Sequence, residues 1–114
     1  MTKDKRSEAQ VLLGIHIREL SKSIPIEYEF RFHEDRQWKA DVYLPGLKLL
    51  IECDGGVFRG GHKRGTALED DYMKQNMAQM LGYHLIRFSN GQVERGEAKA
   101  FLAMWLAKIA GESR

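Results

Sequence analysis

The chain has 114 residues, a formal net charge of +2 and one cysteine, Cys53. This length fits one domain that buries roughly two thirds of the surface exposed by its unfolded form. A single cysteine excludes an internal disulfide framework, and with four scattered histidines it gives no zinc-ligand spacing. We therefore expect one domain over residues 1–114, without structural zinc and with residues 1–6 as a flexible N-terminus.

The apolar runs of the sequence are too short to predict a membrane-targeting or membrane-spanning segment. Residues 1–8 are rich in charge and are not followed by the apolar run of a secretion signal. No apolar run approaches the ~20 residues that cross a bilayer. We expect a soluble, cytoplasmic protein with no membrane contact.

The first elements predicted are a helix and a strand. Residues 7–20 carry an approximate apolar stripe at helical spacing, and Ser7 and Gln10 have the spacing of a capping box. The predicted stripe comprises Val11, Leu12, Ile15 and Leu20. Residues 27–32 alternate aromatic side chains with Glu and Arg. That alternation predicts a strand with one buried face.

A β-hairpin is predicted next, formed by residues 38–44 and 47–54 around the Pro45-Gly46 turn. Its two strands have one acidic side and one apolar side, because successive side chains of a strand point to opposite faces. The apolar side comprises Trp38, Ala40, Val42 and Leu44 opposite Leu49, Ile51 and Cys53.

The second half predicts two helices and one strand. Residues 68–81 form a helix that ends at Gly82, residues 84–88 a short apolar strand that ends at Ser89-Asn90-Gly91, and residues 97–110 the clearest helix. The side chains that we expect in the core are Trp38, Met73, Met77, Met80, Leu81, Phe101 and Trp105. The predicted order is α-β-β-β-α-β-α, an α/β fold whose mixed four-stranded sheet begins with an antiparallel meander and is flanked by helices.

Three carboxylates fall on the acidic side of the hairpin: Asp41, Glu52 and Asp54. A two-residue loop pairs Asp41 with Leu50, whereas a four-residue loop pairs it with Glu52, and both registers keep the three acids on one face. Like charges this close destabilise a fold unless a cation neutralises them, and hard oxygen ligands suit Mg²⁺, Mn²⁺ or Ca²⁺. The hairpin therefore predicts a divalent-metal site.

A basic segment follows these acids immediately. Residues 55–66 contain no acid and carry Arg59, His62, Lys63 and Arg64. Cations beside a carboxylate metal site suit a phosphate-containing substrate. For His62, phosphate contact, proton shuttling and no role all remain open.

Several motifs occur in one order along almost the whole chain. They are Glu8 in the first helix, Asp41, Glu52-Cys53-Asp54-Gly55, Asp71 with Lys74, and Gly82-Tyr83-His84-Leu85-Ile86-Arg87-Phe88. This ordered set resembles the PD-(D/E)XK nuclease superfamily, and within it the small branch of very-short-patch-repair endonuclease relatives. The resemblance covers about residues 7–106 and implies a restriction-endonuclease-like core.

The resemblance implies a metal-dependent DNA endonuclease that hydrolyses phosphodiester bonds. Asp41, Glu52 and the Cys53 carbonyl would hold Mg²⁺, for which Mn²⁺ substitutes, and Asp54 or Glu8 would complete the ligand set. The superfamily's lysine is replaced here by Asp54, so Lys74 is the expected compensating cation.

Further expectations concern DNA binding, oligomeric state, specificity and rival functions. The basic segment would contact DNA phosphates, and a homodimer would let two sites cut both strands. The structural-zinc residues of the repair enzymes are missing here, so their mismatch specificity is not carried over. Two rival functions remain: a non-catalytic nucleic-acid-binding module on the same fold, and a phosphoesterase acting on RNA or nucleotides.

Each candidate residue also has a structural interpretation. Glu8 in a first helical turn is favourable to the helix dipole. Asp71 is an i, i+3 partner for Lys74, which is the role we favour for it, and Lys74 has Asp70 as an alternative partner at i, i+4. Cys53 is more simply a buried small residue than a nucleophile.

Overall fold

The computed structural model describes residues 7–55 and 65–112, so the expectation about residues 1–6 lies outside the described residues. The elements are α1 (Glu8–Leu20), β1 (Glu27–Arg31), β2 (Lys39–Leu44), the 3₁₀ turn η1 (Pro45–Leu47), β3 (Leu49–Asp54), α2 (Thr66–Met80), β4 (His84–Ser89), α3 (Asn90–Glu94) and α4 (Glu97–Glu112). The predicted order is confirmed, with the short helix α3 added where we expected only a strand end. None of the helices in the described part of the chain has the length and hydrophobicity needed to cross a bilayer.

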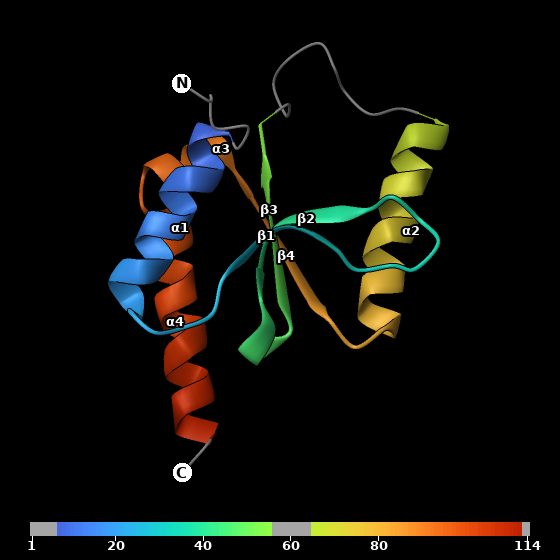
Figure 1. The fold of residues 1–114 in the computed structure, drawn as a ribbon. Helices are drawn as coiled ribbons and strands as arrows, with labels where there is room; N and C mark the ends of the chain where they lie inside the picture. The colour runs from blue at the N-terminus through green and yellow to red at the C-terminus, as the bar shows by residue number, and fades with distance from the viewer. Residues whose placement is uncertain (1–6, 56–64, 113–114) are drawn as a thin grey trace, which may run out of the picture.

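Four strands form one mixed sheet in the order β1-β2-β3-β4. The β1–β2 and β2–β3 pairs are antiparallel, and β3 and β4 are parallel. The sheet stands between two helical layers, with α1, α3 and α4 on one side and α2 on the other (Figure 1). The α/β class and the antiparallel meander are therefore as predicted.

The β2–β3 hairpin has the longer of the two loops considered. Leu44 pairs with Leu49 and Val42 with Ile51, so the connection comprises residues 45–48. Pro45 begins the 3₁₀ turn, and Lys48 closes the loop with a left-handed φ of 50°. Extending this register by one residue places Asp41 opposite Glu52, which decides between the two alternatives.

The larger core cluster lies between the sheet and the α1, α3 and α4 layer. It includes Leu13 and Ile17 of α1, Val42 of β2, Ile51 of β3 and Leu102 of α4, all buried. Val42 and Ile51 are inward positions of the predicted apolar side of the hairpin. The stripe predicted on α1 is wrong in its facing, because Leu13 and Ile17 are buried whereas Ile15 is 52% exposed. Packing on this side therefore fixes which side chains of β2 and β3 point toward α2.

The alternation predicted along β1 is interrupted at Glu29. Tyr28 packs against the larger cluster, whereas Phe30 packs against a second cluster on the α2 side and stacks on Tyr43 with 4.1 Å between ring centroids. Glu29 has a φ of 52°, which reverses the face that the strand presents. Trp38 and Ala40 also belong to the second cluster, so the single apolar side expected for residues 38–44 is wrong in its first half.

Helix α2 contacts the sheet through a different face from the one predicted. Met73 and Met80 are 49% and 70% exposed, Leu81 is also exposed, and Ala78 is the one buried residue of the helix. Phe101 of α4 is likewise exposed, whereas Trp38 and Trp105 are partly buried against the core clusters. The sheet-facing side of α2 carries charged side chains that reach β3 and β4, so the apolar periodicity identified the helix but not its orientation.

Candidate active site on the α2 side of the sheet

Asp41 is held in place by its neighbour strand. It lies on β2, and its Oδ2 accepts a hydrogen bond of 2.7 Å from the backbone N–H of Cys53 on β3. Burial raises the pKa of the Asp41 carboxyl above its ordinary value of 3.8, and the negative charges of Glu52 and Glu29 raise it further against the lowering effects of the Cys53 N–H and Lys74. Asp41 is thus a partly buried acid whose charged neighbours are two carboxylates, of Glu52 and Glu29, and one ammonium, of Lys74.

Glu52 lies at the centre of a charged network that joins α2 to the sheet. It is 7% exposed and forms ion pairs with Lys74 of α2 and with Arg87 of β4, the latter at 3.4 Å between Nη2 and Oε2. Arg87 also donates two hydrogen bonds to Asp71, of 2.9 Å and 3.1 Å. Burial alone would lower the pKa of Arg87, but the bonds to Asp71 and the charge of Glu52 outweigh it and raise that pKa.

Lys74 reaches the candidate site rather than a surface partner. Its Nζ pairs with Glu52 and donates a hydrogen bond of 2.9 Å to the backbone carbonyl of Lys39. Asp71, which we expected to pair with Lys74, instead binds Arg87. The alternative partner Asp70 pairs with Arg36 of the segment before β2. One turn of helix separates positions 71 and 74, which puts both side chains on the side of α2 that faces the sheet.

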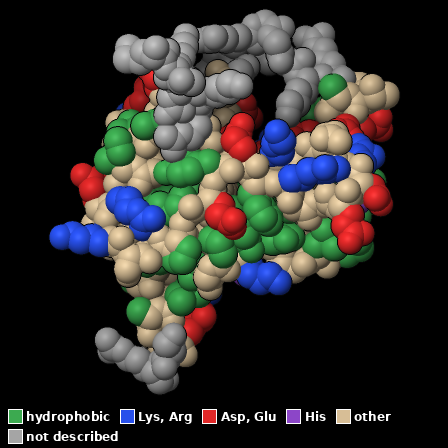
Figure 2. Space-filling view, viewed as in Figure 1, with side chains coloured by type: hydrophobic (Ala, Val, Ile, Leu, Met, Phe, Trp, Pro, Cys, Tyr) green, Lys and Arg blue, Asp and Glu red, His purple; other side chains and the backbone are tan. Residues whose placement is uncertain are grey.

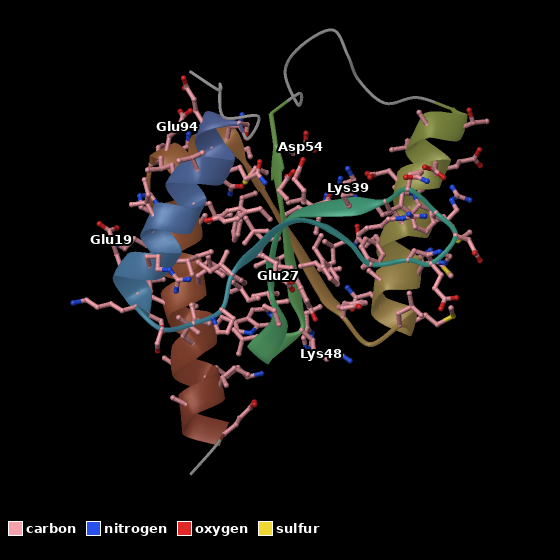
Figure 3. The ribbon with its side chains drawn as sticks, viewed as in Figure 1. Glu19, Glu27, Lys39, Lys48, Asp54 and Glu94 are labelled. Atoms are coloured by element: carbon pink, nitrogen blue, oxygen red, sulfur yellow. The ribbon has the colours of Figure 1, made fainter. Side chains whose placement is uncertain are left out.

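The remaining predicted site residues in the described part of the chain are Asp54 and Glu8. Asp54 ends β3 beyond Glu52, adjoining a cavity of about 580 Å³ that Asn90 and Arg95 also line. Its negative charge contributes to the raised pKa of Arg87. Figure 3 shows Asp54 near the end of β3 and Lys39 on β2. Glu8 is the exposed first residue of α1, and its part in the site remains a prediction.

Cys53 contributes its backbone to the site, whereas its thiol is partly buried against the core. Its side chain packs against the larger core cluster, on the side of the sheet away from α2. Burial raises the pKa of the thiol to about 12, with the charges of Asp41 and Glu52 adding to the effect. The thiol is therefore neutral near pH 7, which agrees with its predicted role as a small packed residue.

Two residues at the site were not identified from sequence. Gln10 of α1 donates a hydrogen bond of 2.6 Å from Nε2 to the Asp41 backbone carbonyl and a longer one of 3.3 Å to Glu29 Oε2. The Ser-x-x-Gln spacing offered a complete local explanation for Gln10, and the alternation of β1 placed Glu29 on an outer face. The one available signal was the spacing of Gln10 to Leu13 and Ile17, which places an amide on the same helix face as two apolar residues.

The predicted DNA contacts at Arg59, His62, Lys63 and Arg64 lie outside the described residues. On the face shown in Figure 2, the Lys and Arg side chains of the described residues alternate with Asp and Glu. That face therefore presents no continuous basic surface among the residues described.

The donor set suits a hard divalent cation that keeps part of its water shell. Within residues 7–55 and 65–112, no three His, Cys, Asp or Glu side chains form a group that could hold a metal ion. Asp41 and Glu52 provide two carboxylates. The backbone carbonyl of Cys53 is a further oxygen donor, which a search of side chains alone does not include. One or two carboxylates completed by water and phosphate oxygens are the usual Mg²⁺ ligands, so the residues present fit such an ion.

The fold and this arrangement of charges define an α/β domain with an acidic site on a mixed sheet. Among solved structures, the domain is similar to the catalytic domain of the homing endonuclease I-Bth0305I, with a TM-score of 0.65 and 17% identity over 90% of this chain and 96% of that one. No protein-family model matches the sequence, and no curated protein matches it. The likeness establishes a shared fold with a nuclease domain.

Proposed function

We propose that this protein is a metal-dependent DNA endonuclease of the PD-(D/E)XK type, related to the very-short-patch-repair branch. The observation that carries the proposal is the juxtaposition of Asp41 and Glu52 on neighbouring strands, with Lys74 brought onto Glu52 from α2. The shared fold with a homing endonuclease catalytic domain supports the same reaction class. DNA is the proposed partner and the cytoplasm the proposed location.

The proposed metal ligands are Asp41, Glu52 and the Cys53 carbonyl, with Asp54 or Glu8 completing the set. Mg²⁺ is the expected ion, with Mn²⁺ as its substitute and no role for zinc. When bound there, such an ion lowers the pKa of a coordinated water and polarises a phosphoryl oxygen.

The protein's own residues would orient the substrate and stabilise charge. The Lys74 ammonium lies beside Glu52 and, in this proposal, stabilises the negative charge that develops on the phosphate. Arg87 pairs with the other carboxylate oxygen of Glu52 and is itself bound by Asp71. Arg59, His62, Lys63 and Arg64 would bind flanking phosphates, which makes DNA binding weaken as salt rises.

The direct test is cleavage of supercoiled plasmid and of branched DNA in Mg²⁺, in Mn²⁺ and in EDTA. Wild-type protein is expected to cut only with the divalent ion, and Glu52→Gln to lose cutting. Glu94→Gln, an equal change of charge at an exposed residue of α3, is the matched control and should cut normally.

Other outcomes of the same experiment identify the rivals. DNA binding without cutting under any condition would favour a non-catalytic nucleic-acid-binding module. Cutting of RNA or nucleotides in preference to DNA would favour a phosphoesterase. A homodimer, proposed for cutting both strands, predicts that linear product appears without accumulation of nicked circles.

A further inference from the structure

Gln10 occupies a position whose side chain usually serves its own helix. In a capping box, the Ser side chain accepts from the backbone N–H three residues on, and the Gln side chain returns to the Ser backbone N–H. Ser89 and Gln92 at α3 make both bonds, of 3.1 Å and 3.0 Å. At α1, Ser7 accepts from the Gln10 N–H at 3.1 Å, but the return bond is not made among the described residues. The same motif is thus completed in one helix and left half-made in the other.

The Gln10 side chain is directed into the sheet at the level of Asp41. Its amide nitrogen donates to the Asp41 carbonyl and to Glu29 Oε2. Gln10 is 3% exposed, and it and Glu52 are the only buried polar or charged residues in the described chain. A buried amide must find hydrogen-bond partners, and the partners of this one lie at the candidate site rather than at the end of its own helix.

Glu29 adopts a backbone conformation that L-residues rarely take. Its φ of 52° lies in the left-handed region. In the β1–β2 register it falls between the Tyr28–Val42 and Phe30–Ala40 pairs, opposite Asp41. Such strain persists only where the surroundings impose it, and it is concentrated at functional sites. Here the strained residue shares its hydrogen-bond donor, Gln10, with Asp41.

We propose that Gln10 and Glu29 are positioning residues for Asp41. Gln10 fixes the Asp41 backbone from α1 while the Cys53 N–H fixes its carboxylate from β3, so the acid is held at both ends. Glu29 accepts the second hydrogen bond of the same amide and turns β1 at this level. The inference rests on the proposed function, since it is in that reaction that the placement of Asp41 matters.

The test compares Gln10→Met, Glu29→Gly and the control Lys99→Met in metal-dependent DNA cleavage and thermal unfolding. Methionine keeps the volume of glutamine and suits a buried position, and glycine accepts φ values above zero at no steric cost. Gln10→Met is expected to lower kcat by about 10²-fold with KM unchanged, the scale of a misplaced catalytic group. Lys99→Met removes an ion pair between α4 and Glu19 of α1 that involves no residue of the candidate site, so it should leave kcat unchanged.

Glu29→Gly separates function from folding because the two effects are expected in opposite directions. Release of the left-handed strain should raise Tm, and loss of the carboxylate should lower kcat. A Gln10→Met protein with lowered Tm and wild-type kcat, or a Glu29→Gly protein with kcat unchanged, would overturn the proposal.

A readout that needs no cleavage keeps this inference separate from the proposed function. The backbone amide signal of Cys53 in a ¹⁵N–¹H NMR spectrum reports its bond to the Asp41 carboxylate. That signal should move in Gln10→Met and stay in place in Lys99→Met, whether or not wild-type protein cuts DNA. An unmoved Cys53 signal in Gln10→Met would refute the positioning role, whereas absence of cutting in wild-type protein would refute only the proposed function.

Discussion

Removing the Lys74 ammonium should destabilise the metal-free protein and expose the charge of Glu52. The Lys74 and Glu52 side chains are 16% and 10% exposed, so their ion pair is mostly shielded from water. Breaking a buried pair by deleting one partner costs about 3–5 kcal/mol. Arg87 remains beside Glu52 at 3.4 Å and compensates part of the loss, so we expect Lys74→Met to cost about 2–3 kcal/mol.

The assay is urea unfolding in EDTA at pH 7, with thermal unfolding beside it. At about 4 °C per kcal/mol for a domain of this size, Lys74→Met should lower Tm by roughly 8–12 °C. The matched control is Lys108→Met, because Lys108 pairs with Glu112 in a largely exposed i, i+4 arrangement. Exposed pairs of that kind contribute about 0.3–0.5 kcal/mol, so the Tm of Lys108→Met should be close to that of the wild-type protein.

A double-mutant cycle with Glu52→Gln isolates the pair itself. Residues in direct contact show coupling energies of about 0.5–3 kcal/mol, whereas independent sites add within about 0.3–0.5 kcal/mol. We expect coupling near the middle of the first range, and in addition tighter Mg²⁺ binding by Lys74→Met, since a competing cation has gone. Additive losses, or weaker Mg²⁺ binding by Lys74→Met, would refute the reasoning.

Three further predictions concern single features. Asp41→Asn should raise stability at pH 7 in metal-free buffer. Because the folded pKa of Asp41 lies above its unfolded value, the native state loses stability as pH rises through that interval. The pH–stability curve of Asp41→Asn should therefore lack this fall. A mutant curve identical to that of the wild-type protein would contradict the raised pKa of Asp41. The Cys53 thiol, with a pKa raised to about 12, should resist iodoacetamide at pH 8 in the native protein and react once urea unfolds it, unlike an accessible thiol, which would react at similar rates in both states. Neutralising Arg59, Lys63 and Arg64 together should flatten the dependence of log Kobs for DNA on log salt by roughly 2–3 units, whereas an unchanged slope would place the DNA surface elsewhere.

The sequence predicted the elements of the fold because its local patterns agree with its packing. The alternation of residues 42–44 and 49–51 corresponds to buried positions in the structure, whereas α1 buries Leu13 and Ile17 and leaves Ile15 of the predicted stripe exposed. The register remained open because two loop lengths are compatible with the same pattern. The 3₁₀ turn at Pro45 and the left-handed Lys48 decide it, and neither follows from period-2 alternation.

The orientation of α2 was not predictable from hydrophobic periodicity. The helix turns Asp71, Lys74 and Ala78 toward the sheet and leaves Met73 and Met80 exposed. Ion pairing with Glu52 and Arg87 joins residues far apart in the chain, so no local pattern contains it. The same holds for Gln10 and Glu29, whose contact depends on how α1 packs against β1 and β2. Sequence patterns thus proposed Asp41 and Glu52 as site residues, and tertiary structure was needed to find the side chains that contact them.

Divalent-cation uptake tests the central claim most directly, that acids of adjacent strands form one metal site. Titration of Mn²⁺ into the protein, followed by electron paramagnetic resonance of the free ion, measures it without DNA or cleavage. We predict saturable binding that Mg²⁺ competes for, and that both Asp41→Asn and Glu52→Gln weaken while Glu94→Gln does not. No saturable uptake, or equal uptake in all three variants, would contradict the account.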